Sequence, residues 1–248
     1  MKQFRIWCFW WMACFSGVGV AADLRLLALE YPPYISQVDG KGVGLTADIV
    51  REAFRRVGKE VSIEFYPWAR MLNMLTHGEA DGLFTIKKTP EREATMLFPK
   101  TPLIVQDYVF FVRKGSPFRF NGEYASLGQA SIGVVNATSY GGRFDEAVKA
   151  GKFARLDAAP TYEQTFKKLL AGRVDVVICS RLVGLSVLLT LEAVDQVEIS
   201  GPPSETTGSY LVFTRKKDWG VVANRLDQAL EAMSKDGTLA RIHRAYGF

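Results

Sequence analysis

Apolar residues follow two different spacings along the chain. Short apolar runs, typical of buried strands, alternate with longer segments in which apolar residues recur every three or four positions, typical of amphipathic helices. In the first half, the strands and helices predicted in order cover residues 24–29, 49–57, 61–66, 67–77 and 80–86. In the second half they cover residues 131–135, 138–150, 153–156, 161–171 and 174–179, followed by helices at 219–233 and 238–246. This alternation predicts an α/β fold with parallel sheets covered by helices.

One short pattern occurs in both halves. Leu-x-x-Gly-x-x-Asp stands at residues 75–81 and again at residues 169–175, and each copy predicts a helix that ends at a glycine just before a parallel strand. The repetition indicates two similar α/β lobes.

Two aromatic-rich β segments, at residues 108–112 and 210–214, join the halves. We expect the chain to leave the first lobe through one of them and to return through the other, which makes a two-strand hinge. Lobe 1 would then comprise residues 23–103 and 209–248, and lobe 2 residues 104–208. A ligand would bind in the cleft between the lobes, outside the carboxyl ends of the strands.

The first 22 residues have the features of a secretory signal peptide. Lys2 and Arg5 precede an apolar run that ends in glycines and small residues. We expect cleavage after Ala22 and export to the periplasm. The alternative, an uncleaved membrane anchor, needs about 20 apolar residues, and this run is shorter. Lipidation at Cys14 is a minor alternative, because the residues before this cysteine meet only one of the two conditions of a lipoprotein signal.

Composition and charge exclude several classes of protein. The chain is 48% hydrophobic and 23% charged, which excludes a disordered chain. Its formal charge of +5 becomes +3 once the leader is removed, and its basic residues form no long run, so no nucleic-acid partner is expected. Cys179 is the single cysteine after the leader and lies in an apolar run, which predicts a buried, unreactive thiol. His77 and His243 are far apart, and we expect no metal and no cofactor.

Aromatic, hydroxyl and basic side chains follow the predicted strands, where the cleft would hold its ligand. A guanidinium group can bind a carboxylate through two parallel hydrogen bonds, which a lysine cannot do. Residues 138 and 139 are expected to open a helix whose free backbone N–H groups would add a second anion-binding element. The candidate ligand-binding residues are Glu30, Tyr31, Trp68, Arg70, Thr85, Lys87, Arg92, Thr138, Ser139 and Ser180. Glu30, Arg70 and Lys87 are equally well explained by pairing with local charges.

These residues carry a resemblance to a known family. The succession Tyr31-x-Pro33-Tyr34, Gly42-x-Gly44-x-x-x-Asp48-Ile49, Trp68, Thr89-Pro90-Glu91-Arg92 and Phe98-Pro99 resembles the bacterial extracellular solute-binding protein family 3, which includes periplasmic receptors for polar amino acids. The resemblance covers essentially the whole chain after the leader. It implies a periplasmic-binding-protein-like fold, a monomer that closes on a small carboxylate such as an amino acid, and an ABC importer permease as partner.

The resemblance also implies roles for individual residues. Arg92 would bind the α-carboxylate of the ligand, and Tyr31 and Trp68 would enclose its side chain. Thr85 would offer a hydroxyl or backbone contact, whereas Thr138 and Ser139 would contact the carboxylate from lobe 2.

The sequence departs from the family at the ammonium site. Ser180 stands where amino-acid receptors of the family usually have an aspartate that accepts the ligand ammonium. Two possibilities follow: Glu30 replaces this acid, or the ligand carries no α-ammonium.

Two other classes of function compete with transport. One is an enzyme on the same fold, such as a periplasmic cyclohexadienyl dehydratase, for which Glu30 is the only local acid and no catalytic triad or metal cluster is evident. The other is a sensory receptor for an organic acid that acts without a transporter. We expect a binding protein rather than an enzyme.

Overall fold

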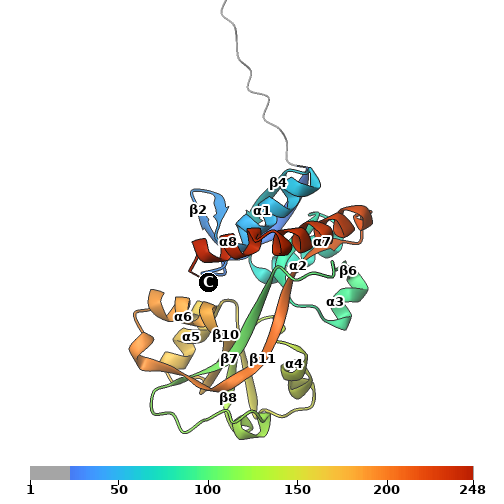
Figure 1. Ribbon diagram of the computed structural model, residues 1–248. Coiled ribbons are helices and arrows are strands. Elements are labelled where there is room, and N and C mark those ends of the chain that lie inside the picture. Colours follow the sequence, from blue (N-terminus) through green and yellow to red (C-terminus); the bar gives the residue numbers. More distant parts are fainter. Residues whose placement is uncertain (1–22, 248) are drawn as a thin grey trace, which may run out of the picture.

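The structure is a computed structural model, and it describes residues 23–247. The proposed signal peptide, with Lys2, Arg5, Cys14 and Ala22, lies outside the described residues. Nine strands form one hydrogen-bonded sheet in the order β4-β1-β5-β11-β7-β10-β8-β9, with β6 paired to β11 beside this path. The strands gather into two lobes joined by β7 and β11 (Figure 1).

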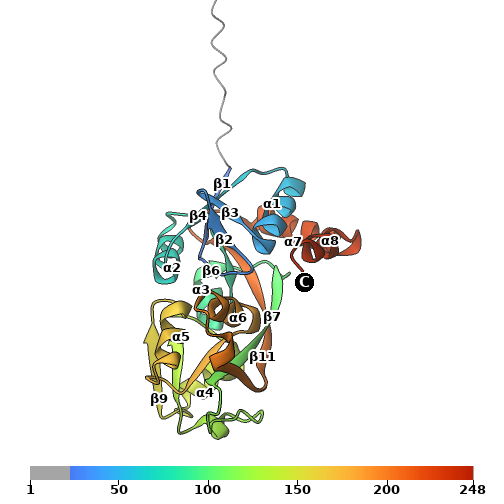
Figure 2. The ribbon, with the colours of Figure 1, turned by 90° about the vertical axis from the view of Figure 1, so that its left-hand side faces the viewer.

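Lobe 1 contains three parallel strands. The strands are β1 (Leu24–Ala28), β4 (Val61–Phe65) and β5 (Gly82–Ile86), with β1 in the middle. Helix α2 (Trp68–His77) lies on one side of these strands, whereas α1 (Leu45–Val57), α7 (Gly220–Lys235) and α8 (Thr238–Ala245) lie together on the other side (Figure 2). The remaining elements of this lobe are β2 (Ser36–Val38), β3 (Lys41–Val43), α3 (Pro90–Thr95) and β6 (Met96–Leu97).

Successive residues of the central strand pack into different parts of the core. Leu26 belongs to the larger buried cluster, with Phe54 of α1, and Leu27 belongs to the smaller one, with Met71 of α2. Side chains alternate across a strand, so β1 is buried on both faces. This explains why the strand is apolar at every position except Arg25 rather than alternating.

Lobe 2 repeats the same construction. Its parallel strands are β8 (Ser131–Val135), β9 (Arg155–Ala159) and β10 (Val176–Ser180), with β8 in the middle. Helices α5 (Tyr162–Leu170) and α6 (Arg181–Thr190) cover one side and α4 (Gly142–Lys149) the other (Figure 1). Two 3-10 helices, η1 (Tyr124–Leu127) and η2 (Val194–Gln196), complete this lobe. The predicted α/β class with two lobes is confirmed.

Two long antiparallel strands connect the lobes. Strand β7 (Ile104–Arg113) pairs with β11 (Val197–Thr214) over its whole length, from Ile104 opposite Ser209 to Arg113 opposite Val197. Strand β11 continues beside β5 of lobe 1, and β7 continues beside β10 of lobe 2. We call β7 and β11 the hinge strands. The exact lobe boundaries remain a prediction.

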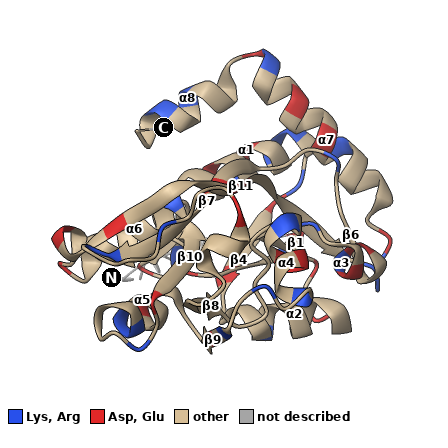
Figure 3. Ribbon diagram, turned by 90° about the horizontal axis from the view of Figure 1, so that it is seen from below, with Lys and Arg blue, Asp and Glu red and all other residues tan. Residues whose placement is uncertain are grey.

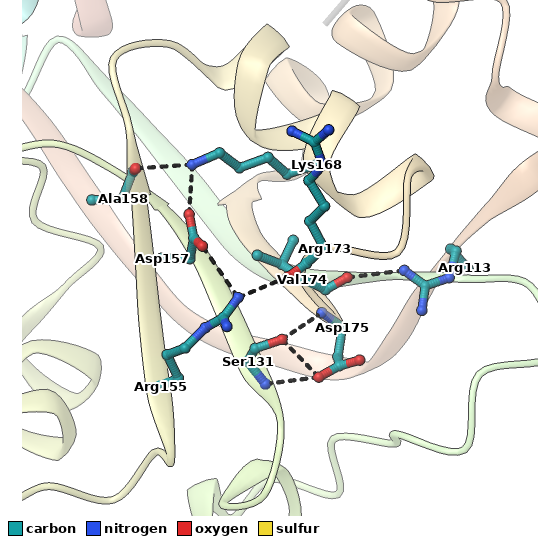
Figure 4. Close-up of polar contacts among 9 residues, drawn as sticks. All are labelled: Arg113, Ser131, Arg155, Asp157, Ala158, Lys168, Arg173, Val174 and Asp175. Carbon is teal, nitrogen blue, oxygen red and sulfur yellow. Dashed lines mark hydrogen bonds and ion pairs between the residues drawn. The ribbon is translucent and has the colours of Figure 1, made fainter.

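The repeated Leu-x-x-Gly-x-x-Asp pattern has the same structural role in each lobe. In lobe 2 the carboxylate of Asp175 accepts hydrogen bonds from the backbone N–H and the hydroxyl of Ser131, at 2.9 and 2.7 Å, at the start of the neighbouring strand β8 (Figure 4). In lobe 1 Asp81 accepts the backbone N–H of Arg25 at 2.7 Å, at the start of β1. Each aspartate therefore fixes the register of two parallel strands.

The predicted helix at residues 138–150 begins later than expected. Helix α4 starts at Gly142, because Ala137 and Gly141 have positive φ angles of 55° and 119°, which interrupt a right-handed helix. Residues 136–141 form a turn at the end of β8 instead. Strand β9 also begins two residues later than the predicted strand at 153–156.

Basic and acidic residues are mixed along the same elements. Helix α7, for example, carries both signs (Figure 3). Cys179 is fully buried and unpaired, as expected, and burial raises the pKa of its thiol. Within residues 23–247 no helix combines the length and the apolar character that crossing a bilayer requires.

Candidate functional site

A cavity of about 600 Å³ lies between the lobes, where the carboxyl ends of their parallel strands face each other. Lobe 1 contributes the segments that follow β1, β4 and β5, and lobe 2 contributes the segments that follow β8 and β9, together with α6. Eight of the ten predicted site residues line this cavity: Glu30, Tyr31, Trp68, Thr85, Lys87, Arg92, Thr138 and Ser139. The structure therefore brings together residues more than 100 positions apart in the sequence.

Arg92 lies in the first turn of α3 and is held there by local structure. The side chain of Thr89 caps this helix by accepting the backbone N–H of Arg92, and Pro90 follows the cap. The guanidinium group donates to the backbone oxygens of Lys87 and Ala137, at 2.9 and 3.0 Å. These bonds use two of its five N–H groups, and the other three form no hydrogen bond with the described residues. A carboxylate in the cavity can accept from them.

The ring of Trp68 packs beside this guanidinium. The Cζ atom of Arg92 lies 5.4 Å from the ring centroid, a cation–π arrangement. The indole N–H donates to the backbone oxygen of Ala137 at 2.9 Å. A single lobe 2 carbonyl thus accepts from two lobe 1 residues, and it connects the lobes beside the cavity. An exposed ion pair between Lys149 and Glu91, at 3.0 Å, also joins α4 to α3.

Tyr31 forms part of an aromatic wall. Its hydroxyl lies 3.2 Å from the hydroxyl of Tyr108, and its ring lies 5.8 Å from that of Tyr34 and 5.9 Å from that of Tyr162. Burial is the main cause that raises the pKa of Tyr31, so the phenol is neutral at physiological pH. This wall suits an apolar or planar part of a ligand.

Thr85 and Lys87 lie at the end of β5. Thr85 has a φ angle of 66°, which is uncommon for a β-branched residue, and its hydroxyl donates to the backbone oxygen of Phe84 at 2.6 Å. Lys87 is only 4% exposed, and its ammonium lies 4.5 Å from the ring centroid of Tyr108. Burial lowers the pKa of Lys87 to about 7, which is far below the ordinary value for lysine.

Lobe 2 does not offer the anion site that the sequence predicted. The first backbone N–H groups of α4, those of Gly142 and Arg143, donate to the carboxylate of Glu205 at 3.1 and 3.0 Å. The start of this helix is therefore already capped by an acid. Thr138 and Ser139 reach the cavity from the preceding turn, and the hydroxyl of Ser139 donates to Asp145.

Three predicted residues lie differently from the expectation. Arg70 does not line the cavity: it is exposed, and its guanidinium lies 4.7 Å from the ring centroid of Tyr66. Ser180 is buried outside the cavity wall, where its hydroxyl oxygen accepts from Gln106 Nε2 at 3.1 Å. Glu30 does line the cavity, but it is exposed and already accepts the backbone N–H of Gln37 at 2.7 Å.

Sequence reasoning missed part of the wall. The cavity is also lined by Tyr108 of β7, Tyr162 of α5, Val183 of α6, Phe65 at the end of β4 and Tyr66 just after it. The signal for Tyr162 was available, because its capping residue Thr161 marks a helix start just after a strand. Tyr108 lies in the middle of a hinge strand, so a search for residues at strand ends does not find it.

The acidic and metal-ligating side chains near the cavity are few and lie apart. Among residues 23–247, no group of three or more histidine, cysteine, aspartate or glutamate side chains is arranged to hold a metal ion. The acids of the cavity wall, Glu30 and Glu163, are exposed, and Glu163 is paired with Lys167. The geometry provides hydrogen-bond donors, aromatic rings and two cations around one cleft.

Comparison with known proteins agrees with this geometry. Residues 26–248 match the bacterial extracellular solute-binding proteins, family 3. The chain is 25% identical over 218 residues to the L-cystine-binding protein TcyJ of Escherichia coli strain K12, covering 86% of this chain and 79% of that one. It is 23% identical over 207 residues to the L-cystine-binding protein TcyA of Bacillus subtilis strain 168, covering 83% and 73%.

Solved structures share the fold at low sequence identity. An ancestral arginine-binding protein bound to arginine superposes with a TM-score of 0.76 at 21% identity, covering 91% of this chain and 98% of that one. A periplasmic binding protein of an arginine transport system from Legionella pneumophila superposes with a TM-score of 0.77 at 17% identity, covering 91% and 100%.

Proposed function

The chain belongs to the bacterial extracellular solute-binding proteins, family 3, and from this premise we propose that it captures a small carboxylate, an amino acid, for an ABC importer. The observation that carries the proposal is the guanidinium of Arg92, which lies in the cavity wall with three N–H groups that no described residue occupies. A planar group of this kind is suited to two parallel hydrogen bonds to a carboxylate.

The remaining wall supports the same function. Tyr31 and Trp68 would enclose the side chain of the ligand, and Thr85, Thr138 and Ser139 would offer polar contacts from both lobes. The volume of about 600 Å³ accommodates a ligand as large as the cystine bound by the curated relatives. A cleft of this size with a few polar groups among aromatic rings is typical of small-molecule sites.

We also propose how the protein works in the cell. Residues 1–22 direct export to the periplasm, where the mature monomer meets an inner-membrane permease. Residues 23–103 and 209–248 form lobe 1, residues 104–208 form lobe 2, and the lobes close on the ligand about the hinge strands, as in other hinge-closing receptors. The ligand leaves chemically unchanged.

A thermal-shift screen of residues 23–248 tests the proposal. A ligand that binds only the folded state raises the unfolding midpoint. We expect at least one amino acid or related carboxylate to stabilise the wild type and to stabilise Arg92→Lys much less. The absence of any stabilising carboxylate would contradict the proposal.

A further inference from the structure

Lys87 has an unusual position at the junction of the cavity and the hinge. It lines the cavity from the end of β5, yet its side chain reaches across to β11. Its ammonium donates to the backbone oxygens of Thr207 and Gly208, at 3.1 and 3.2 Å, and to the hydroxyl oxygen of Ser209 at 2.9 Å. The lysine thus connects lobe 1 to a hinge strand directly beside the cavity.

The three acceptors around Lys87 match the charged form of the side chain. The hydroxyl of Ser209 donates its own hydrogen to Gln106 Oε1 at 2.7 Å, so its oxygen is left as an acceptor toward Lys87. A protonated lysine has three N–H groups, one for each acceptor, whereas a neutral amine has two. Loss of the proton would leave one buried oxygen of β11 without its donor.

No carboxylate of the described residues is in direct contact with this charge. Lys88, the next residue, pairs with Glu93 at 3.0 Å, whereas Lys87 forms no ion pair with the described residues. Arg92 of α3 has the same sign, and β7 presents the uncharged side chains of Tyr108 and Gln106 on this side. Glu205 of β11 is the nearby carboxylate that favours the charged form of Lys87, but it forms no ion pair with Lys87 and accepts from the start of α4. Removing a charged group from water costs free energy, and this burial is the main cause that lowers the pKa of Lys87.

The acids of the cavity wall do not supply the missing negative charge. Glu30 accepts from Gln37, Glu163 pairs with Lys167, and both glutamates are exposed at the rim. The two cations Lys87 and Arg92 therefore line the cavity, whereas the carboxylates that favour their charge, Glu205 and Asp145, lie outside the wall and accept hydrogen bonds from α4 and from Ser139. An α-amino acid with a neutral side chain brings one carboxylate and one ammonium, which leaves the net charge of the cavity unchanged.

We infer that Lys87 is the charge-selecting residue of this cavity and that the ligand carries a net negative charge. The inference rests on the proposed capture of a carboxylate and narrows it to two sources of the same chemistry: an acidic amino acid, or a carboxylate without an amine. The three N–H groups of Lys87 are already bonded to β11, so Lys87 attracts an anionic ligand through its charge and not through a hydrogen bond of its own. Arg92 makes the direct contact with the ligand.

Matched pairs of ligands test the selection by charge. Calorimetric titration of residues 23–248 at pH 7 compares L-glutamate with L-glutamine, and 3-phenylpropionate with L-phenylalanine. The members of each pair have similar shape and differ in net charge. We expect the anionic member of any pair that binds to bind at least tenfold more tightly. Tighter binding of an acidic amino acid points to the first source, and tighter binding of the amine-free acid to the second.

Variants at two adjacent positions assign the preference to Lys87. Lys87→Met should abolish the preference for the anionic member, and Lys87→Arg, which keeps the charge, should retain it. Lys88→Met is the matched control, because Lys88 is exposed and lies outside the cavity wall. Circular dichroism establishes that each variant is folded before titration.

Proton uptake tests the inference on the wild type alone. Burial lowers the pKa of Lys87 to about 7, and binding of an anion favours its charged form. The ligand should therefore bind with uptake of up to about one proton at pH 8 and with lower affinity at pH 8 than at pH 6. Titration in phosphate and in Tris, which differ in ionisation enthalpy, measures this uptake. Lys87→Arg should show none.

The outcomes separate this inference from the proposed function. Equal or tighter binding of the neutral member, or a preference that survives in Lys87→Met, overturns the inference while capture of a carboxylate stands. Binding without proton uptake at pH 8 also overturns it. A protein that binds none of the amino acids or carboxylates in the titrations and the thermal-shift screen contradicts the proposed function, and the inference falls with it.

Discussion

Replacement of Arg92 should weaken ligand binding far more than it weakens the fold. Its guanidinium lies in the cavity wall over the ring of Trp68, and burial lowers its pKa without removing its charge at any physiological pH. When the lobes are closed on the ligand, Arg92→Ala would leave the carboxylate of the ligand without its partner. Removal of one member of such a pair costs about 2–5 kcal/mol of binding, or roughly 30-fold to several-thousand-fold in Kd.

Arg92→Lys separates charge from geometry. Lysine keeps the positive charge but cannot form two parallel hydrogen bonds or retain both backbone contacts to Lys87 and Ala137. We therefore expect the lysine variant to bind at least tenfold more weakly than the wild type. Arg70→Ala is the control, because Arg70 lies on an adjacent helix outside the cavity wall.

Calorimetric titration with the tightest ligand from the thermal-shift screen provides the comparison. Urea unfolding of each variant separates loss of binding from loss of stability. An Arg92→Ala variant that is folded and binds within threefold of the wild type would refute the role of Arg92. So would an Arg70→Ala variant with an equally large loss of affinity.

Three further predictions address the hinge closure, the fold and the leader. Trp68→Phe removes the N–H that donates to Ala137 but keeps a ring, so we expect a loss of about 0.5–1.5 kcal/mol, a few-fold in Kd by calorimetry; unchanged affinity would show that this contact does not stabilise the closed form. Asp175→Ala removes the acceptor for two hydrogen bonds from Ser131 and should lower the free energy of unfolding in urea by about 1–3 kcal/mol, and a neutral effect would contradict its role in strand register. The exported protein should begin at residue 23 in intact-mass analysis, and a mass that includes residues 1–22 would exclude cleavage.

The sequence predicted the strand ends well because burial leaves a clear pattern. Strand β1 is buried on both faces, so its residues are apolar except for Arg25, and the predicted end at Leu29 lies one residue beyond the observed end at Ala28. In α/β folds the strand ends define the cleft, which is why eight of the ten candidate residues were found from local sequence. Arg92 was found for an added reason: its helix start is marked by Thr89 and Pro90.

Each error has a physical cause that the structure identifies. Trp68 and Arg70 are two positions apart on α2, so they project about 200° apart, and only one can face the cavity. Ser180 is the last residue of β10, but its hydroxyl accepts from Gln106 of a hinge strand, a contact between residues 74 positions apart. The start of α4 is displaced by the turn at residues 136–141 and capped by Glu205, 63 positions from Gly142. Local spacing carries no information about such distant partners.

The central claim is that the protein binds one small carboxylate and does not convert it. A proton NMR titration of residues 23–248 with the tightest carboxylate from the thermal-shift screen tests it most directly, because one sample reports both stoichiometry and chemical identity. The account predicts saturation at one ligand per chain and, after prolonged incubation and denaturation, recovery of the same compound in full. A ligand spectrum replaced by that of a new compound would contradict it and assign the protein to the enzymes of this fold.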